Sequence, residues 1–148
     1  MANIYDAKTF QPREGLGFFI GRARKTFILE LEKELAPYDV SSSQWAVILN
    51  IYDGRATTAG EMCKVMRYDP GAMTRLLDRL EDKNFLRRMR TGDDRRTVQL
   101  ELTPSGKALR PKIINALVTV LNRLLRGFTK TEVRQLKDML DRINANAQ

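Results

Sequence analysis

The chain has 148 residues, the usual size of one domain, and its 43% of hydrophobic residues can form a core and argues against disorder. Lysine and arginine number 26 against 18 acidic residues, and the net charge of +8 favours an anionic partner such as nucleic acid. The absence of histidine and the single cysteine exclude Ser-His and Cys-His catalytic pairs, so we expect no metal site, no cofactor and no enzyme.

The amino terminus Met1-Ala2-Asn3 is polar and does not resemble a secretory signal. No run of residues approaches the roughly 18 apolar residues that a membrane helix needs. We therefore expect a cytoplasmic protein with no membrane partner.

A long helix is predicted first, ending near Pro37. Its apolar residues recur at helical spacing. They are Leu16, Phe19, Ile20, Ala23 and Phe27.

Five later helix starts are marked by capping signals. Residues 41–44, 58–61 and 129–132 each pair a Ser or Thr with a Gln or Glu three residues later, which is the pattern of a capping box. Asp69-Pro70 and Thr103-Pro104 place a capping side chain before a proline that loses no hydrogen bond at the first helical position. The helix that begins at Thr103-Pro104 also contains Pro111, which we expect to bend the helix or to delay its regular start.

Only residues 85–102 are predicted to form strands. Phe85 and Leu86 can anchor a first arm, and residues 98–102 alternate between apolar and polar side chains in the return arm. Thr91-Gly92-Asp93 supplies the turn between the arms. The fold class is therefore mainly α with a small β-hairpin (α+β).

Residues 58–83 have the spacing of a helix-turn-helix, whose second helix enters the DNA major groove. In that helix, Gly71 and Ala72 are small enough to let the backbone approach the groove floor. Thr74 can bond a base or phosphate or touch a thymine methyl group, Arg75 can read guanine, and Arg79 is better placed for phosphate. Lys83 is assigned to the same outward face. The alternative is a charged helix face that is only solvated.

The hairpin carries five arginines within residues 87–96. A hairpin with a half-buried base and an arginine tip is a wing, and arginines in a narrow minor groove respond to its width and potential. Arg90, Arg95 and Arg96 are the candidate contacts. An ion pair between Asp94 and Arg96 would fix the turn. The alternative is a plain surface hairpin.

These motifs resemble the MarR family of winged-helix transcriptional regulators. The resemblance covers nearly the whole chain and rests on Gly60-Glu61-Met62, residues 69–81, Asp94-Arg95-Arg96 and residues 100–106. It implies a triangular homodimer on a pseudopalindromic operator, with recognition helices in successive major grooves and wings in the flanking minor grooves. It also implies that Thr74, Arg75 and Arg79 contact DNA from the recognition helix. Either Arg95 or Arg96 would then be the wing contact.

The domain organisation follows from this resemblance and from the apolar surface of the two chain ends. The 148 residues form one domain, with a winged helix-turn-helix lobe over residues 41–102. The helices within residues 10–36 and 104–147 have more apolar surface than a lone winged helix needs, so they are interpreted as a dimerisation lobe. The alternative is a bundle formed within one chain.

A small ligand is a further expectation, because many relatives release DNA when an aromatic or phenolic molecule binds between the two lobes. Phe18, Phe19, Trp45 and Leu49 could line such a cavity, with Arg22 facing a carboxylate. The alternative is an ordinary aromatic core with Arg22 on the surface. Ligand control works only if the ligand prefers one arrangement of the lobes.

Cys63 is the remaining reactive group. Oxidation-sensing members of the family carry their cysteine near the start of the first helix, whereas Cys63 lies in the helix before the recognition helix. We expect a small buried residue with no redox role. The sequence as a whole predicts a sequence-specific regulator, more often a repressor; a non-specific architectural protein and a helical protein–protein adaptor are the alternatives.

Overall fold

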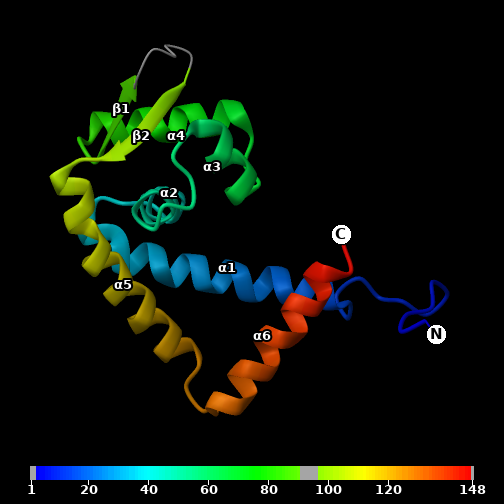
Figure 1. Cartoon of the computed structure of the whole chain (residues 1–148). Helices are drawn as coiled ribbons and strands as arrows, with labels where there is room; N and C mark the ends of the chain where they lie inside the picture. The colour runs from blue at the N-terminus through cyan, green and yellow to red at the C-terminus, as the bar shows by residue number, and fades with distance from the viewer. Residues whose placement is uncertain (1–2, 91–96, 148) are drawn as a thin grey trace.

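The computed structural model describes residues 3–90 and 97–147. The elements follow in the order α1 (Leu16–Leu35), η1 (Ala36–Tyr38), α2 (Ser42–Tyr52), α3 (Ala59–Met66), α4 (Pro70–Asp82), β1 (Leu86–Arg90), β2 (Val98–Leu102), α5 (Pro104–Leu124) and α6 (Lys130–Ala145). Helices α1, α5 and α6 outline a triangle, and α2, α3, α4 and the hairpin lie together beyond its α1–α5 corner (Figure 1). The predicted mainly α fold with one β-hairpin is confirmed.

All five predicted capping signals form. The side chains of Ser41, Thr58 and Thr129 cap α2, α3 and α6 in complete capping boxes. Asp69 accepts from the N–H of Ala72 at the start of α4, and Thr103 accepts from the N–H of Gly106 at the start of α5. Each bond satisfies a backbone donor that the first helical turn leaves unpaired.

Pro111 lies inside α5 and does not delay its start, so of the two expected effects only a bend stays as a prediction. The helix begins at Pro104 and continues through Pro111 to Leu124. Thr103 and Pro104 together fix the first turn, because the cap supplies an acceptor and the proline ring already has a helical φ angle.

The core joins the carboxyl-terminal half of α1 to the middle of α5 and to the helix-turn-helix. Leu31 and Leu35 of α1 and Ile113 and Val120 of α5 are almost fully buried. Arg123 of α5 links the same two helices from outside the core through ion pairs with Glu30 (2.8 Å) and Glu34. The amino-terminal half of α1 and all of α6 lie outside this core, since neither contains a fully buried residue.

The hairpin is held at its base. β1 and β2 are antiparallel, with Leu86 opposite Leu102 and Arg90 opposite Val98. The N–H of Leu100 also donates to the carbonyl of Thr57, 2.8 Å away, just before α3. The strands therefore start from a fixed position beside the helix-turn-helix. Among the residues that the structure describes, no helix combines the length and apolar character needed to span a membrane.

Candidate nucleic-acid interface

Helix α4 has one buried face and one exposed face. Its inward residues Met73, Leu76, Leu77 and Leu80 are all buried. Burying a side chain of this size contributes roughly 1.5–3 kcal/mol, so these four residues together hold the helix firmly on the core. The outward residues Gly71, Thr74, Arg75 and Arg79 are exposed and Ala72 is half-buried, as the sequence predicts for a recognition helix.

Thr74 is more restricted than the sequence suggests. Its hydroxyl donates to the carbonyl of Pro70 at 3.0 Å, within the same helix. A phosphate oxygen accepts hydrogen bonds but cannot donate them, so Thr74 can bond a phosphate only if this internal bond breaks. The two lone pairs of the Thr74 hydroxyl can still accept from a base amino group, and its methyl group can contact a thymine methyl group.

A groove of about 200 Å³ runs beside the exposed face of α4. Its lining combines two guanidinium groups, three hydroxyl groups and little apolar surface. The lining residues are Ser41, Ser43, Tyr68, Ala72, Arg75, Leu76 and Arg79. Cations and hydroxyl donors are the groups that hold phosphate oxygens, so this groove can take a backbone phosphate. The sequence assigns no DNA contact to Ser41, Ser43 or Tyr68. The two serines lie at the start of α2 and Tyr68 lies between α3 and α4, where no periodic signal marks a binding residue.

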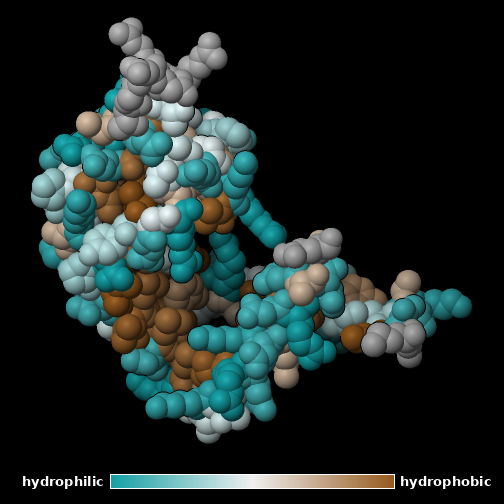
Figure 2. Space-filling view, viewed as in Figure 1, coloured by the Kyte–Doolittle hydropathy of each residue, from teal (hydrophilic) through white to brown (hydrophobic). Residues whose placement is uncertain are grey.

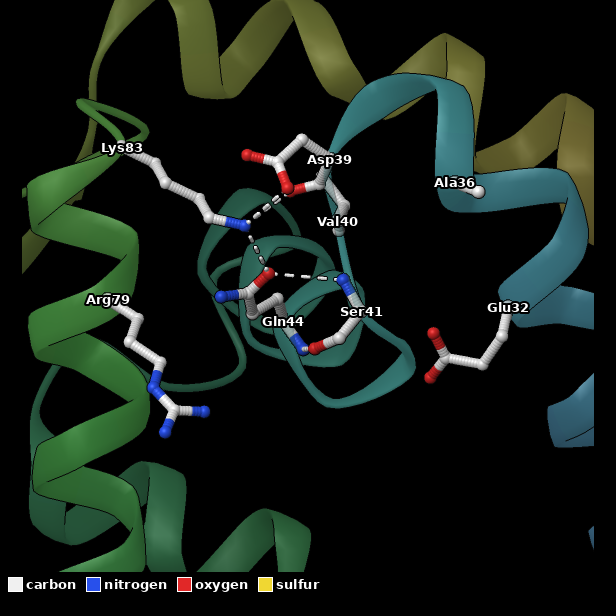
Figure 3. A pocket seen from close by; sticks show the side chains of 8 residues that line it. All are labelled: Glu32, Ala36, Asp39, Val40, Ser41, Gln44, Arg79 and Lys83. Atoms are coloured by element: carbon white, nitrogen blue, oxygen red, sulfur yellow. Dashed lines mark hydrogen bonds and ion pairs between the residues drawn. The ribbon is translucent and has the colours of Figure 1, made fainter.

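A second pocket of about 350 Å³ lies between the end of α4 and the junction of α1 with α2 (Figure 3). Lys83 crosses this junction: its Nζ donates to the carbonyl of Asp39 at 2.6 Å and contacts the Asp39 carboxylate at 3.0 Å and Gln44 Oε1 at 3.4 Å. The assignment of Lys83 to the outward face of α4 is therefore wrong. The helix ends at Asp82, and the capping residue Lys83 turns its side chain toward the adjacent lobe.

Two of the hairpin arginines stabilise the wing itself. Arg87 pairs with Glu101 on the opposite strand, Nε to Oε2 at 2.7 Å. Arg88 reaches back to the recognition helix, where it pairs with Asp78 at 2.7 Å and with Glu81. The base of the wing is thus tied to α4 by charge-assisted hydrogen bonds.

The charge state of Arg88 is secured by these partners. Burial alone would lower the pKa of Arg88, but hydrogen bonds to Asp78 and Glu81 and the charges of both carboxylates raise that pKa above its ordinary value. Arg88 therefore stays a cation while its guanidinium is partly removed from water.

Arg90 is exposed at the end of β1, on the side of the hairpin tip. Arg95, Arg96 and the expected Asp94–Arg96 ion pair lie outside the described residues. The wing contact by Arg95 or Arg96 stays a prediction.

The five residues of the expected ligand cavity fall into two groups. Phe18 and Phe19 are exposed on α1, and the Arg22 guanidinium lies over both rings at 5.6 and 5.2 Å from their centroids. Trp45 and Leu49 are half-buried and pack against the core. Neither pocket described above includes any of the five. The cavity stays a prediction.

Cys63 is a half-buried free thiol that packs against the core from α3. Cys63 is thus less buried than expected from the sequence, and the absence of a redox role stays a prediction. In residues 3–90 and 97–147, no group of three or more cysteine, aspartate or glutamate side chains could hold a metal ion.

Comparison with known proteins identifies the arrangement. A sequence model of the MarR family matches residues 40–98. The multiple antibiotic resistance protein MarR of Salmonella typhimurium is 33% identical over 114 residues, which span 76% of this chain and 79% of that protein. The structure of wild-type Escherichia coli MarR in its apo form superimposes with a TM-score of 0.75 at 29% identity, covering 87% of this chain and 96% of that one.

A mutant of Escherichia coli MarR complexed with operator DNA superimposes with a TM-score of 0.80 at 29% identity. The match covers 86% of this chain and 92% of that chain. The chain belongs to the MarR family of winged-helix transcriptional regulators.

Proposed function

We propose that this protein is a sequence-specific DNA-binding repressor that acts as a homodimer on a pseudopalindromic operator. The observation that carries the proposal is the outer face of α4, where Arg75 and Arg79 are exposed one turn apart on a helix whose inner face is buried. The wing base is tied to the same helix through Arg88. A helix held on the core and a hairpin held at its base can then contact adjoining grooves of one duplex.

Apolar surface supports the homodimer. Large apolar side chains are exposed at the amino-terminal half of α1, the end of α5 and along α6. These side chains are Leu16, Phe18, Phe19, Ile20, Val118, Leu121, Phe128, Leu136, Met139, Leu140 and Ile143. Figure 2 shows part of this surface as a brown area over the lower part of the triangle. An apolar surface of this extent marks an interface, and a second copy brings two recognition helices to one operator.

Release by a small aromatic ligand is also part of the proposal. Trp45 Nε1 is buried and has no hydrogen-bond partner within the described residues. A buried N–H group usually has a hydrogen-bond acceptor, and leaving it without one costs free energy. An acceptor on a bound molecule would remove this cost. The exposed Phe18 and Phe19, with Arg22 beside them, supply aromatic surface and a cation for an acidic ligand once a second copy covers α1.

The test is a footprint of the purified protein on the DNA upstream of its own gene, with and without benzoate and hydroxybenzoates. We expect protection of two half-sites separated by about one helical turn of DNA. Addition of a ligand that binds should remove this protection. The variant R75A is expected to weaken protection of the half-sites while the protein stays folded.

The two alternative functions, a non-specific architectural protein and a protein–protein adaptor, predict different footprints. An architectural protein would bind random duplex and operator with similar affinity, whereas specific regulators discriminate by about 10³-fold or more. A protein–protein adaptor would bind neither duplex. Either result would overturn the proposed function.

A further inference from the structure

The end of the recognition helix is held at the junction between the two lobes by Lys83. Its ammonium group donates to a backbone carbonyl, that of Asp39, and lies 3.0 Å from the Asp39 carboxylate. Asp39 follows η1 and therefore belongs to the short segment that connects α1 to α2. Residues 39 and 83 are far apart in the sequence, so this contact joins α4 to the exit of α1 directly (Figure 3).

The same ammonium group also reaches the capping box of α2. Gln44 Oε1 accepts from the N–H of Ser41 at 3.1 Å and lies 3.4 Å from Lys83 Nζ. Gln44 is 4% exposed, so its amide oxygen is fixed in place. The α2 start is in turn held to α1, because Glu32 accepts from the N–H of Ser42 at 2.8 Å. A continuous set of bonds thus runs from α1 through the α2 start to the end of α4.

The end of α4 is not closely packed against α1, so the hydrogen bonds of Lys83 are what hold the two elements together here. The pocket of about 350 Å³ separates the end of α4 from α1, and Lys83 lies on its wall. Asp39 has a φ of 54°, a conformation that aspartate tolerates better than most residues, and this conformation fixes the direction of its carbonyl group. The apolar face of α4 sets how deeply the helix lies on the core, but apolar contacts have little directionality.

We propose that Lys83 is a positioning residue that sets the angle of the recognition helix relative to α1 and thereby the half-site spacing that the dimer accepts. This inference rests on the proposed homodimer. A small rotation of α4 about its buried face moves its exposed tip along the duplex, in opposite directions in the two copies. The spacing between half-sites therefore depends on the Lys83 contact, whereas the bases read within each half-site depend on the exposed side chains of α4.

The test is selection from a randomised duplex library with wild-type protein, K83M, K83R and the control K107M. Lys107 is an exposed lysine in the first turn of α5, so K107M removes the same charge without touching this junction. Folding is checked by thermal melting and the dimer by sedimentation. K83A, which also removes the ammonium donor, is used in place of K83M if the latter does not fold.

We expect the wild type and K107M to select paired half-sites at one spacing. K83M should select the same half-site sequence at several spacings, and its discrimination between them should fall by about tenfold, the factor that corresponds to one charge-assisted hydrogen bond. K83R should restore part of the selectivity. A folded, dimeric K83M or K83A with wild-type spacing selectivity would overturn the inference alone. A wild type that selects no paired half-sites would overturn the proposed dimeric function, and this inference with it.

Discussion

Gly106, in the first turn of α5, lies directly against the backbone carbonyl of Phe85. A Cβ atom at residue 106 would be 1.9 Å from that oxygen, which is far inside a normal contact. The two residues join the start of α5 to the base of the hairpin, where the Phe85 carbonyl also accepts from the N–H of Thr103 at 3.2 Å.

The substitution Gly106→Ala should therefore destabilise the protein. Because backbone and not a flexible side chain opposes the added methyl group, we expect a loss of about 1–3 kcal/mol in the free energy of unfolding, measured by urea denaturation. Gly60→Ala is the matched control, since a Cβ there meets nothing within 4 Å. An alanine at 106 that leaves the unfolding midpoint unchanged would show that the hairpin and α5 can separate freely.

Arg75 and Arg79 should differ in what they contribute to DNA binding. R75A should cost about 1–3 kcal/mol and relax specificity at one base pair of each half-site, because a bidentate contact to guanine is lost. R79A should weaken binding to all duplexes and lower the slope of log affinity against log salt by about one per site. Fluorescence anisotropy at several salt concentrations distinguishes them. Identical salt slopes and specificities for the two variants would contradict these roles.

Arg88 should act through the position of the wing. R88A removes the contacts with Asp78 and Glu81, and we expect weaker DNA binding with a loss of about 1 kcal/mol in stability, since the carboxylates are half exposed. R88K keeps the charge but cannot contact both carboxylates in the same way, so it should rescue only part of the affinity. Full affinity of R88A in the same assay would show that the wing needs no link to α4.

The exposed apolar face of α6 should hold the dimer together. Met139→Glu places a charge among Leu136, Leu140 and Ile143, and we expect sedimentation to show dissociation of the dimer at micromolar concentration. Arg134→Glu introduces the same side chain on the opposite, polar face and should leave the dimer intact. A dimeric M139E would place the interface elsewhere.

Glu61 should make stability depend on acid pH. Hydrogen bonds from the backbone and hydroxyl of Thr57, and then from Thr58, lower the pKa of Glu61 below its ordinary value of 4.5. Because the folded-state pKa is lower than the unfolded one, the stabilisation is present above pH 4.5 and is lost as pH falls through the folded-state pKa.

The variant E61Q keeps an acceptor for the capping box but cannot titrate. Its melting temperature should fall less steeply than that of the wild type below pH 4.5, as followed by circular dichroism. Equal slopes for both proteins would mean that this carboxylate does not contribute to acid unfolding.

The sequence predicts local features of this fold well and non-local ones poorly. The caps at Ser41, Thr58 and Thr129 depend on residues three positions apart, and all of them form as expected. The two faces of α4 follow from its periodicity. Periodicity places Lys83 on the outward face of α4, but its partner Asp39 lies in a different part of the chain, and no local sequence pattern indicates that contact.

The wing shows the same distinction. Alternating apolar residues predict the strands, and the described residues confirm their pairing. The number of arginines does not reveal that Arg87 and Arg88 are already engaged by Glu101 and by α4. Ion pairs across a hairpin depend on the strand register, which is fixed only after the chain has folded.

Helix α6 has a pronounced apolar face but buries none of its residues within one chain. A helix of 16 residues is only marginally stable alone in water, so its order depends on what covers it. In the proposed homodimer a second copy covers α6, so the concentration of the chain would set how much of each molecule is ordered at this end. At low concentration α6 would then be open to proteolysis, and at high concentration the second copy would protect it, so the rate of synthesis would also influence the lifetime of the protein.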